Sequence, residues 1–329
     1  MSLPSTLLAK TVRKVKKIRR KLMKPDFKQI TEEQIEKRNY WIGEIENLSG
    51  NFGDDFDRLQ TKLRSEIKAE GSHSLLSHVR LCGAIPEHYP HDSSAEKLYS
   101  KYTDALLAET FQFLGITSLV LTERSDAADV ECVARDYSFV ADAKAFRLSR
   151  TAKNQKDFKV QAMDNWKNGK IYAMVVCPSY QLPSRSSQIY QQAISRNVCI
   201  FSYSHLIVLI QFAEKHGKQK AETALKMIFE MIGRLQPSKD AQSYWKALNS
   251  TLLNCHDYLS KVWRREKRAT LEVVEIAKRE ALADLAKERE RIMRLPRETA
   301  LRELVRKSNI DNRETMIKRV SDSQILTMV

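Results

Sequence analysis

The chain has 329 residues, a hydrophobic content of 42% and a formal net charge of +15 at pH 7. This length can bury one large core or two modest ones, and the charge favours nucleic acid or an anionic membrane surface as a partner. The charge is uneven, because residues 1–30 hold ten Lys or Arg and one acidic residue, Asp26, which gives this segment a net charge of +9.

Cysteine usage and apolar runs exclude several classes of protein. The five cysteines are scattered and include no C-x-x-C pair, which argues against a disulfide framework and against a cysteine zinc site. The longest apolar run, residues 206–210, is too short to cross a bilayer, and no signal-peptide core follows the N-terminus. We therefore expect a cytoplasmic protein with no membrane association.

The first predicted element is a basic amphipathic helix over residues 7–24, which Pro25 would end. Three interpretations of this helix are open: an arm on the DNA backbone, a solvated helix whose apolar stripe docks on the body, and a membrane-surface or transit segment. A capping box that begins at Thr31 predicts a second helix to about Ile45. Further helices are predicted over residues 54–69 and 73–82.

The middle of the chain alternates helices and strands. Ser93 predicts the start of a long helix that runs to about Leu114, and strands follow at residues 119–121, 128–133 and 138–146. Residues 154–167 are predicted to be helical, and two more strands, at residues 171–176 and 198–201, flank a polar loop at residues 184–188. This order predicts an α/β fold in which helices cover a mixed central sheet.

The C-terminal part is predicted to be almost entirely helical from Ser204 onward. The stretch from Lys261 to Arg294 carries dense mixed charge beside a thin apolar stripe, which indicates either a solvated face or a dimer seam. The predicted segments are therefore a basic arm (1–30), a helical region (31–92), an α/β core (93–210) and a helical region (211–329).

One short apolar strand carries two charged side chains, which are rare in a buried core. Asp142 and Lys144 lie two residues apart, so they share one face of the strand over residues 138–146. A turn at residues 135–138 would fold the chain into a hairpin and bring Asp129 beside Asp142. Two carboxylates and an ammonium group suit a site for a divalent metal and a phosphate, and this spacing is typical of PD-(D/E)xK nucleases. The alternative is a surface strand with a simple ion pair.

Residues 139–160, which contain Asp142 and Lys144, closely resemble the active-site segment of the HindIII family of type II restriction endonucleases. A looser similarity extends from about Ser93 to about Leu206. The resemblance implies a PD-(D/E)xK nuclease core with largely helical N- and C-terminal regions. It also implies Mg²⁺-dependent cleavage of double-stranded DNA at a palindrome, with AAGCTT, the site that HindIII-like enzymes cut, as the expected sequence, by a homodimer with two active sites.

The candidate catalytic residues follow from this chemistry. Asp129, Asp142 and the carbonyl of Ala143 are the predicted Mg²⁺ ligands, and Lys144 would hold the attacking water or offset developing charge. Whether Lys144 is a base, and whether one or two metals act, is open. Glu96 has two compatible interpretations: it closes a capping box, or it reaches toward the metal as a helix glutamate does in nucleases of this class.

A basic segment directly follows the catalytic strand. Its cations suit DNA phosphates, and its amides suit adenine edges. The predicted DNA-binding residues are Arg147, Arg150, Lys153, Asn154, Gln155, Lys156 and Lys159. A solvated basic turn is the plain alternative. The competing functions are a related DNA nuclease without fixed sequence specificity, for example in repair, and a DNA-binding protein that keeps the fold but does not cut.

Overall fold

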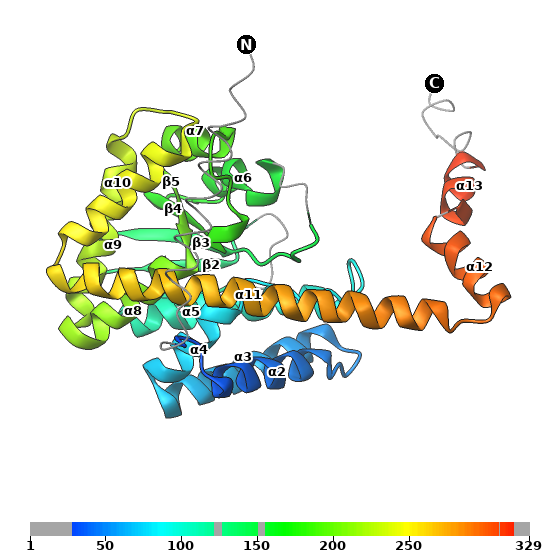
Figure 1. The fold of residues 1–329 in the computed structure, drawn as a ribbon. Coiled ribbons are helices and arrows are strands. Elements are labelled where there is room, and N and C mark those ends of the chain that lie inside the picture. Colours follow the sequence, from blue (N-terminus) through cyan, green and yellow to red (C-terminus); the bar gives the residue numbers. More distant parts are fainter. Residues whose placement is uncertain (1–27, 122–126, 151–154, 309, 319–329) are drawn as a thin grey trace, which may run out of the picture. The chain divides into compact units, whose positions relative to one another are not determined.

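The computed structural model describes residues 28–121, 127–150, 155–308 and 310–318 (Figure 1). The helix predicted over residues 7–24 lies outside the described residues, as does most of the predicted basic arm. The described chain divides into two compact units, one that ends at Ala281 and one that begins at Leu282. The predicted division at residues 30, 92 and 210 stays a prediction.

In the described part of the chain, three helices come before α5 (Ser94–Phe113): α2 (Glu32–Glu46), α3 (Phe52–Glu70) and α4 (Ser72–Leu81). The predicted capping box is present, since the Thr31 side chain accepts the N–H of Gln34 and the Gln34 side chain accepts the N–H of Thr31. The apolar stripe of α3 is buried against the neighbouring helices, so the predicted helices in this region are confirmed.

Helix α5 (Ser94–Phe113) connects these helices to the sheet. The Ser93 side chain accepts the N–H of Glu96 at its start. Just beyond its end Gly115 has φ of +87°, a conformation that side chains with a Cβ atom rarely adopt. Helix α5 then packs across β1 (Thr117–Val120), β2 (Val130–Val133) and β3 (Ser138–Ala143).

The sheet has the order β1-β2-β3-β4-β5, with β4 at Tyr172–Cys177 and β5 at Val198–Ser202. Strands β1, β2 and β3 pair antiparallel, whereas β3, β4 and β5 pair parallel. Strand β5 is buried throughout and β4 at all but its first residue, because helices cover the parallel half. The predicted helix-covered mixed sheet is therefore confirmed (Figure 1).

The connections between the parallel strands differ from the prediction. The helix predicted over residues 154–167 is two pieces, η1 (Gln155–Phe158) and α6 (Val160–Asn165), because Lys159 between them has φ of 48°. After η2 (Ser179–Gln181), helix α7 (Gln188–Ser195) begins within the predicted polar loop, where the Ser187 side chain accepts the N–H of Ile189. Strand β3 ends at Ala143, three residues earlier than predicted.

The described residues after β5 are almost entirely helical, as predicted. The helices are α8 (Tyr203–His216), α9 (Lys218–Arg234), α10 (Ala241–Asn254), α11 (Asp257–Met293), α12 (Arg297–Lys307) and α13 (Ile310–Lys318). Helix α8 is buried along most of its length, and it packs against β5, α4 and α9. Among the helices in the described ranges, none combines the length and apolar character that a membrane crossing requires.

Candidate active site

Three aspartates from three different elements converge beside the antiparallel hairpin. Val130 of β2 pairs with Ala141 of β3, so Asp129, the residue just before β2, comes next to Asp142 of β3. Asp104 comes from α5, which packs across the same strands. One carboxylate oxygen from each aspartate lies within 4.8 Å of the other two. The predicted hairpin is observed, and a third carboxylate joins it.

Two lysines neutralise part of this acidic cluster. Lys144 Nζ lies 2.5 Å from Asp142 Oδ2. Lys101 Nζ, from the turn of α5 that precedes Asp104, lies 2.7 Å from Asp129 Oδ1 and 3.4 Å from Asp104 Oδ2. Asp104 and Asp142 are both buried. Buried carboxylates are costly unless they are paired with cations, and three acids with two lysines leave one formal negative charge unpaired.

The pKa values of these groups shift in different directions. Burial, together with the charges of Asp129 and Asp142, raises the pKa of Asp104 well above its usual range. Burial also raises the pKa of Asp142, although Lys144 opposes this shift. Burial disfavours the charge of Asp129 as well, but Lys101 outweighs it and lowers the pKa of that carboxyl.

Lys144 is a cation at neutral pH. Burial alone would lower the pKa of its ammonium group, but the adjacent carboxylate of Asp142 outweighs burial and raises it. The backbone of Lys144 is also fixed on both sides. Its N–H donates to the Val176 carbonyl at 2.8 Å, and the hydroxyl of Tyr203 donates to its carbonyl at 3.1 Å.

The cluster suits a hard divalent cation. Mg²⁺ prefers oxygen ligands, and Asp104, Asp129 and Asp142 supply three carboxylates at one point. Oδ1 of Asp142 is buried and has no hydrogen-bond partner among the described residues, so one lone pair of the cluster faces no donor. Ala143 ends β3 next to this atom, and a ligand role for its carbonyl stays a prediction.

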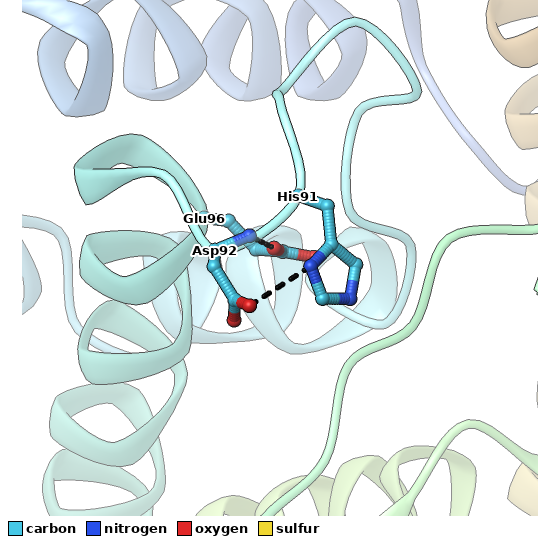
Figure 2. Close-up of side chains that lie close together, drawn as sticks. All are labelled: His91, Asp92 and Glu96. Carbon is cyan, nitrogen blue, oxygen red and sulfur yellow. Dashed lines mark hydrogen bonds and ion pairs between the residues drawn. The ribbon is translucent and has the colours of Figure 1, made fainter. Parts of the chain in front are cut away.

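Glu96 lies at the first turn of α5, eight residues before Asp104, which is roughly 12 Å along a helix axis. Figure 2 shows its side chain beside His91 and Asp92. The Asp92 N–H donates to Glu96 Oε2 at 2.7 Å, and His91 Nδ1 lies 3.0 Å from Asp92 Oδ2. The Glu96 carboxylate thus receives the N–H one residue before the N-cap, whereas the N–H of Ser93 donates to the Pro90 carbonyl, so the predicted capping box is only half formed. Its predicted catalytic role stays a prediction.

The basic segment begins beside this carboxylate. Arg147 Nη2 lies 2.9 Å from Glu96 Oε1, and the arginine side chain is largely buried. Arg150 pairs with Asp157 at 2.5 Å, and its guanidinium carbon lies 5.5 Å from the centre of the Phe146 ring.

The structure shows few contacts for the other predicted DNA-binding residues, and two of them lie outside the described ranges. Lys159 Nζ lies 5.2 Å from the centre of the Trp166 ring. Lys159 also belongs, after Lys144, to the cations that oppose the effect of burial on the pKa of Asp142. Gln155 and Lys156 form the first turn of η1, whereas Lys153 and Asn154 lie outside the described residues.

Sequence reasoning missed Asp104 and Lys101. Asp104 is the only charged residue in the stretch 102–108, where most of the other residues are apolar. Acidic residues are rarely buried unless they are paired. A lone aspartate on such a helix, three residues after a lysine, was therefore the available signal.

Comparison with known proteins identifies the family of this chain. The family model for the HindIII restriction endonuclease matches residues 38–321. The Type II restriction enzyme HindIII of Haemophilus influenzae (strain ATCC 51907 / DSM 11121 / KW20 / Rd) is 42% identical over 169 residues, which are 51% of this chain and 55% of that enzyme. The pairwise match thus spans about half the length of the relative, whereas the family match extends through most of the chain. The chain belongs to the HindIII restriction endonuclease family.

Proposed function

We propose that this protein is a type II restriction endonuclease that uses Mg²⁺ to cut both strands of DNA at a palindrome, with AAGCTT as the expected site. The observation that carries the proposal is the convergence of Asp104, Asp129 and Asp142 with Lys144. The name of the relative, a type II restriction enzyme, supports the same reaction class. We expect it to act in the cytoplasm, on DNA that enters the cell.

The three aspartates would hold the metal. When bound, Mg²⁺ would lower the pKa of a water molecule and neutralise charge on the phosphoryl group. Asp142 would present its unpaired Oδ1 to the metal while Oδ2 keeps its contact with Lys144. Because Lys144 is held as an ammonium ion, its role is to donate a hydrogen bond to a phosphoryl oxygen or the attacking water and to stabilise negative charge.

The segment after β3 would place the DNA over this cluster. Arg147 forms an ion pair with Glu96 and Arg150 with Asp157, so both guanidinium groups already lie in the segment that follows β3 before DNA binds. Lys153, Lys156 and Lys159 would add phosphate contacts, and Asn154 and Gln155 would read base edges. Glu96 then contributes through the position of Arg147, and the carbonyl of Ala143 would complete the metal ligands.

Cleavage of both strands of a palindrome requires two such sites related by a twofold axis. The described chain supplies one cluster of three aspartates with Lys144. We therefore infer that two copies of the chain act as a homodimer on one DNA duplex.

The test is incubation of purified protein with a long duplex DNA, in Mg²⁺ and in EDTA, followed by sequencing of the fragment ends. We expect discrete Mg²⁺-dependent fragments whose ends derive from AAGCTT. The variant Asp142→Asn should leave the DNA intact. Asp136→Asn is the matched control, because Asp136 lies in the turn of the same hairpin, where its side chain is 64% exposed, and it should cut like the parent protein.

The other outcomes separate the alternatives. Discrete fragments with different ends would keep the enzyme class and replace the recognition site. A smear would identify a nuclease without sequence specificity. Intact DNA that is retarded on a gel, with either metal condition, would contradict cleavage and identify a binding protein.

A further inference from the structure

Lys101 occupies the space between two of the three aspartates. Its ammonium nitrogen lies 2.7 Å from Asp129 Oδ1 and 3.4 Å from Asp104 Oδ2, so one cation bridges two carboxylates that come from different elements. A metal ion shared by the same carboxylates would bind at about 2.1 Å from their oxygens. Two cations that share these oxygens would lie within a few ångströms of each other and repel strongly.

We propose that Lys101 is a built-in counter-ion of the carboxylate cluster, and that a divalent cation binds by displacing its ammonium group from Asp129 and Asp104. The inference rests on the proposed function for the choice of site. It concerns metal binding and not cleavage, so this proposal and the proposed nuclease function can fail separately.

The two lysines of the cluster differ in how firmly they are held. The side chain of Lys144 is 12% exposed, and its backbone is fixed by Val176 and Tyr203. The side chain of Lys101 is 27% exposed, which leaves a path to solvent by rotation of its four-carbon stem. Lys101 is therefore the cation that can leave, and Lys144 is the one that stays on Asp142.

Charge balance favours the same exchange. With all three carboxyl groups ionised, as metal ligation requires, the aspartates together with Lys101 and Lys144 carry one formal negative charge. Replacing the single charge of Lys101 by a divalent cation makes the cluster neutral while Lys144 remains in place. The unpaired Oδ1 of Asp142 provides a further ligand atom that Lys101 does not contact.

The first experiment measures Mn²⁺ affinity by calorimetry, without DNA, for the full chain and for Lys101→Met. Methionine keeps the aliphatic stem and removes the charge. The control is Lys97→Met, one turn earlier on α5, because Lys97 is exposed and its loss changes the net charge equally. We expect Lys101→Met to bind Mn²⁺ at least about tenfold more tightly than Lys97→Met. Equal or weaker binding by Lys101→Met would overturn the proposal.

A second measurement uses the unaltered protein, in case Lys101→Met does not fold without metal. The rate at which an amine-reactive ester labels Lys101 is followed by mass spectrometry, with Lys97 as the internal reference. Mn²⁺ should increase labelling of Lys101 severalfold and leave Lys97 unchanged. Mn²⁺ binding with unchanged labelling of Lys101 would refute the displacement while leaving metal-dependent cleavage intact. Absence of Mn²⁺ binding in every protein would overturn both proposals.

Discussion

Replacement of Asp104 by asparagine should stabilise the protein and at the same time weaken DNA cleavage. Asp104 is 3% exposed, and its carboxylate lies within 4.8 Å of those of Asp129 and Asp142. Two carboxylates at that separation repel by roughly 3 kcal/mol at an effective dielectric constant of about 20. Lys101 and Lys144 offset part of this repulsion. We therefore expect the neutral asparagine to raise the free energy of unfolding by about 1–2 kcal/mol near neutral pH.

The raised pKa of Asp104 predicts how the stability gain of Asp104→Asn changes with pH. Burial and the neighbouring carboxylates raise the pKa of Asp104, so the folded protein retains a proton that the unfolded chain releases. Stability is thus lost as pH rises above the usual aspartate pKa, about 4, toward the folded value. Asparagine does not titrate, so the advantage of Asp104→Asn over the parent protein should grow as pH increases from about 4.

The assay is urea unfolding in EDTA at several pH values, together with single-turnover cleavage in Mg²⁺. We expect the rate of cleavage by Asp104→Asn to fall by on the order of 100-fold or more, because a proposed metal ligand is lost. Asp55→Asn is the matched control: Asp55 is equally buried, but its carboxylate accepts the N–H of Ser49 at 3.0 Å, so this variant should lose stability and keep its cleavage rate. A less stable Asp104→Asn that still cuts at the parent rate would refute the reasoning.

Three further predictions concern the groups around the cluster. Lys144→Met should lower the single-turnover rate by about 100- to 1,000-fold, while Mn²⁺ titration shows that metal binding is retained. Tyr203→Phe removes the hydrogen bond to the Lys144 carbonyl and should cost about 1–3 kcal/mol in urea unfolding, with a slower cleavage step. Burial lowers the pKa of His205 to about 4, so the folded protein should lose about 3 kcal/mol of stability as pH falls from about 6.5 to 4, since only the unfolded chain takes up the proton. The variant His205→Gln should show a flatter pH profile of unfolding, and an unchanged profile would contradict this assignment.

The hairpin and its charges were predictable because they depend on local sequence. Asp142 and Lys144 share a strand face by alternation, and a short turn returns the chain from β2 to β3. The mixed sheet was also predictable, since β4 and β5 appear as short apolar runs between helical stretches.

The third carboxylate was not predictable in the same way. Asp104 reaches the cluster only because α5 packs across β1–β3, and the sequence does not specify which face of α5 meets the strands at residue 104. The break at Lys159 was missed for a related reason. A left-handed residue other than glycine carries no strong sequence signal, so the pattern over residues 154–167 predicts one continuous helix.

Helix α7 was not predicted because its first residues are polar. Ser187 lies at the end of a run of serines that predicts a loop, yet it caps the helix by accepting the N–H of Ile189. The apolar residues that follow, Ile189, Tyr190, Ala193 and Ile194, then bury one face of α7 against β5.

The five charged side chains of the cluster all come from one continuous stretch, from Lys101 to Lys144. Helix α5 and the segment of the β2–β3 hairpin therefore contribute all five of these side chains, whereas β4, β5 and the later helices support the cluster from outside, as Tyr203 does. Substitutions in those later elements that keep the support of Tyr203 would leave the proposed metal ligands and Lys144 in place. Under the proposed function, cleavage would depend on residues 101–144, and the choice of DNA site on the basic segment that follows them, residues 147–159.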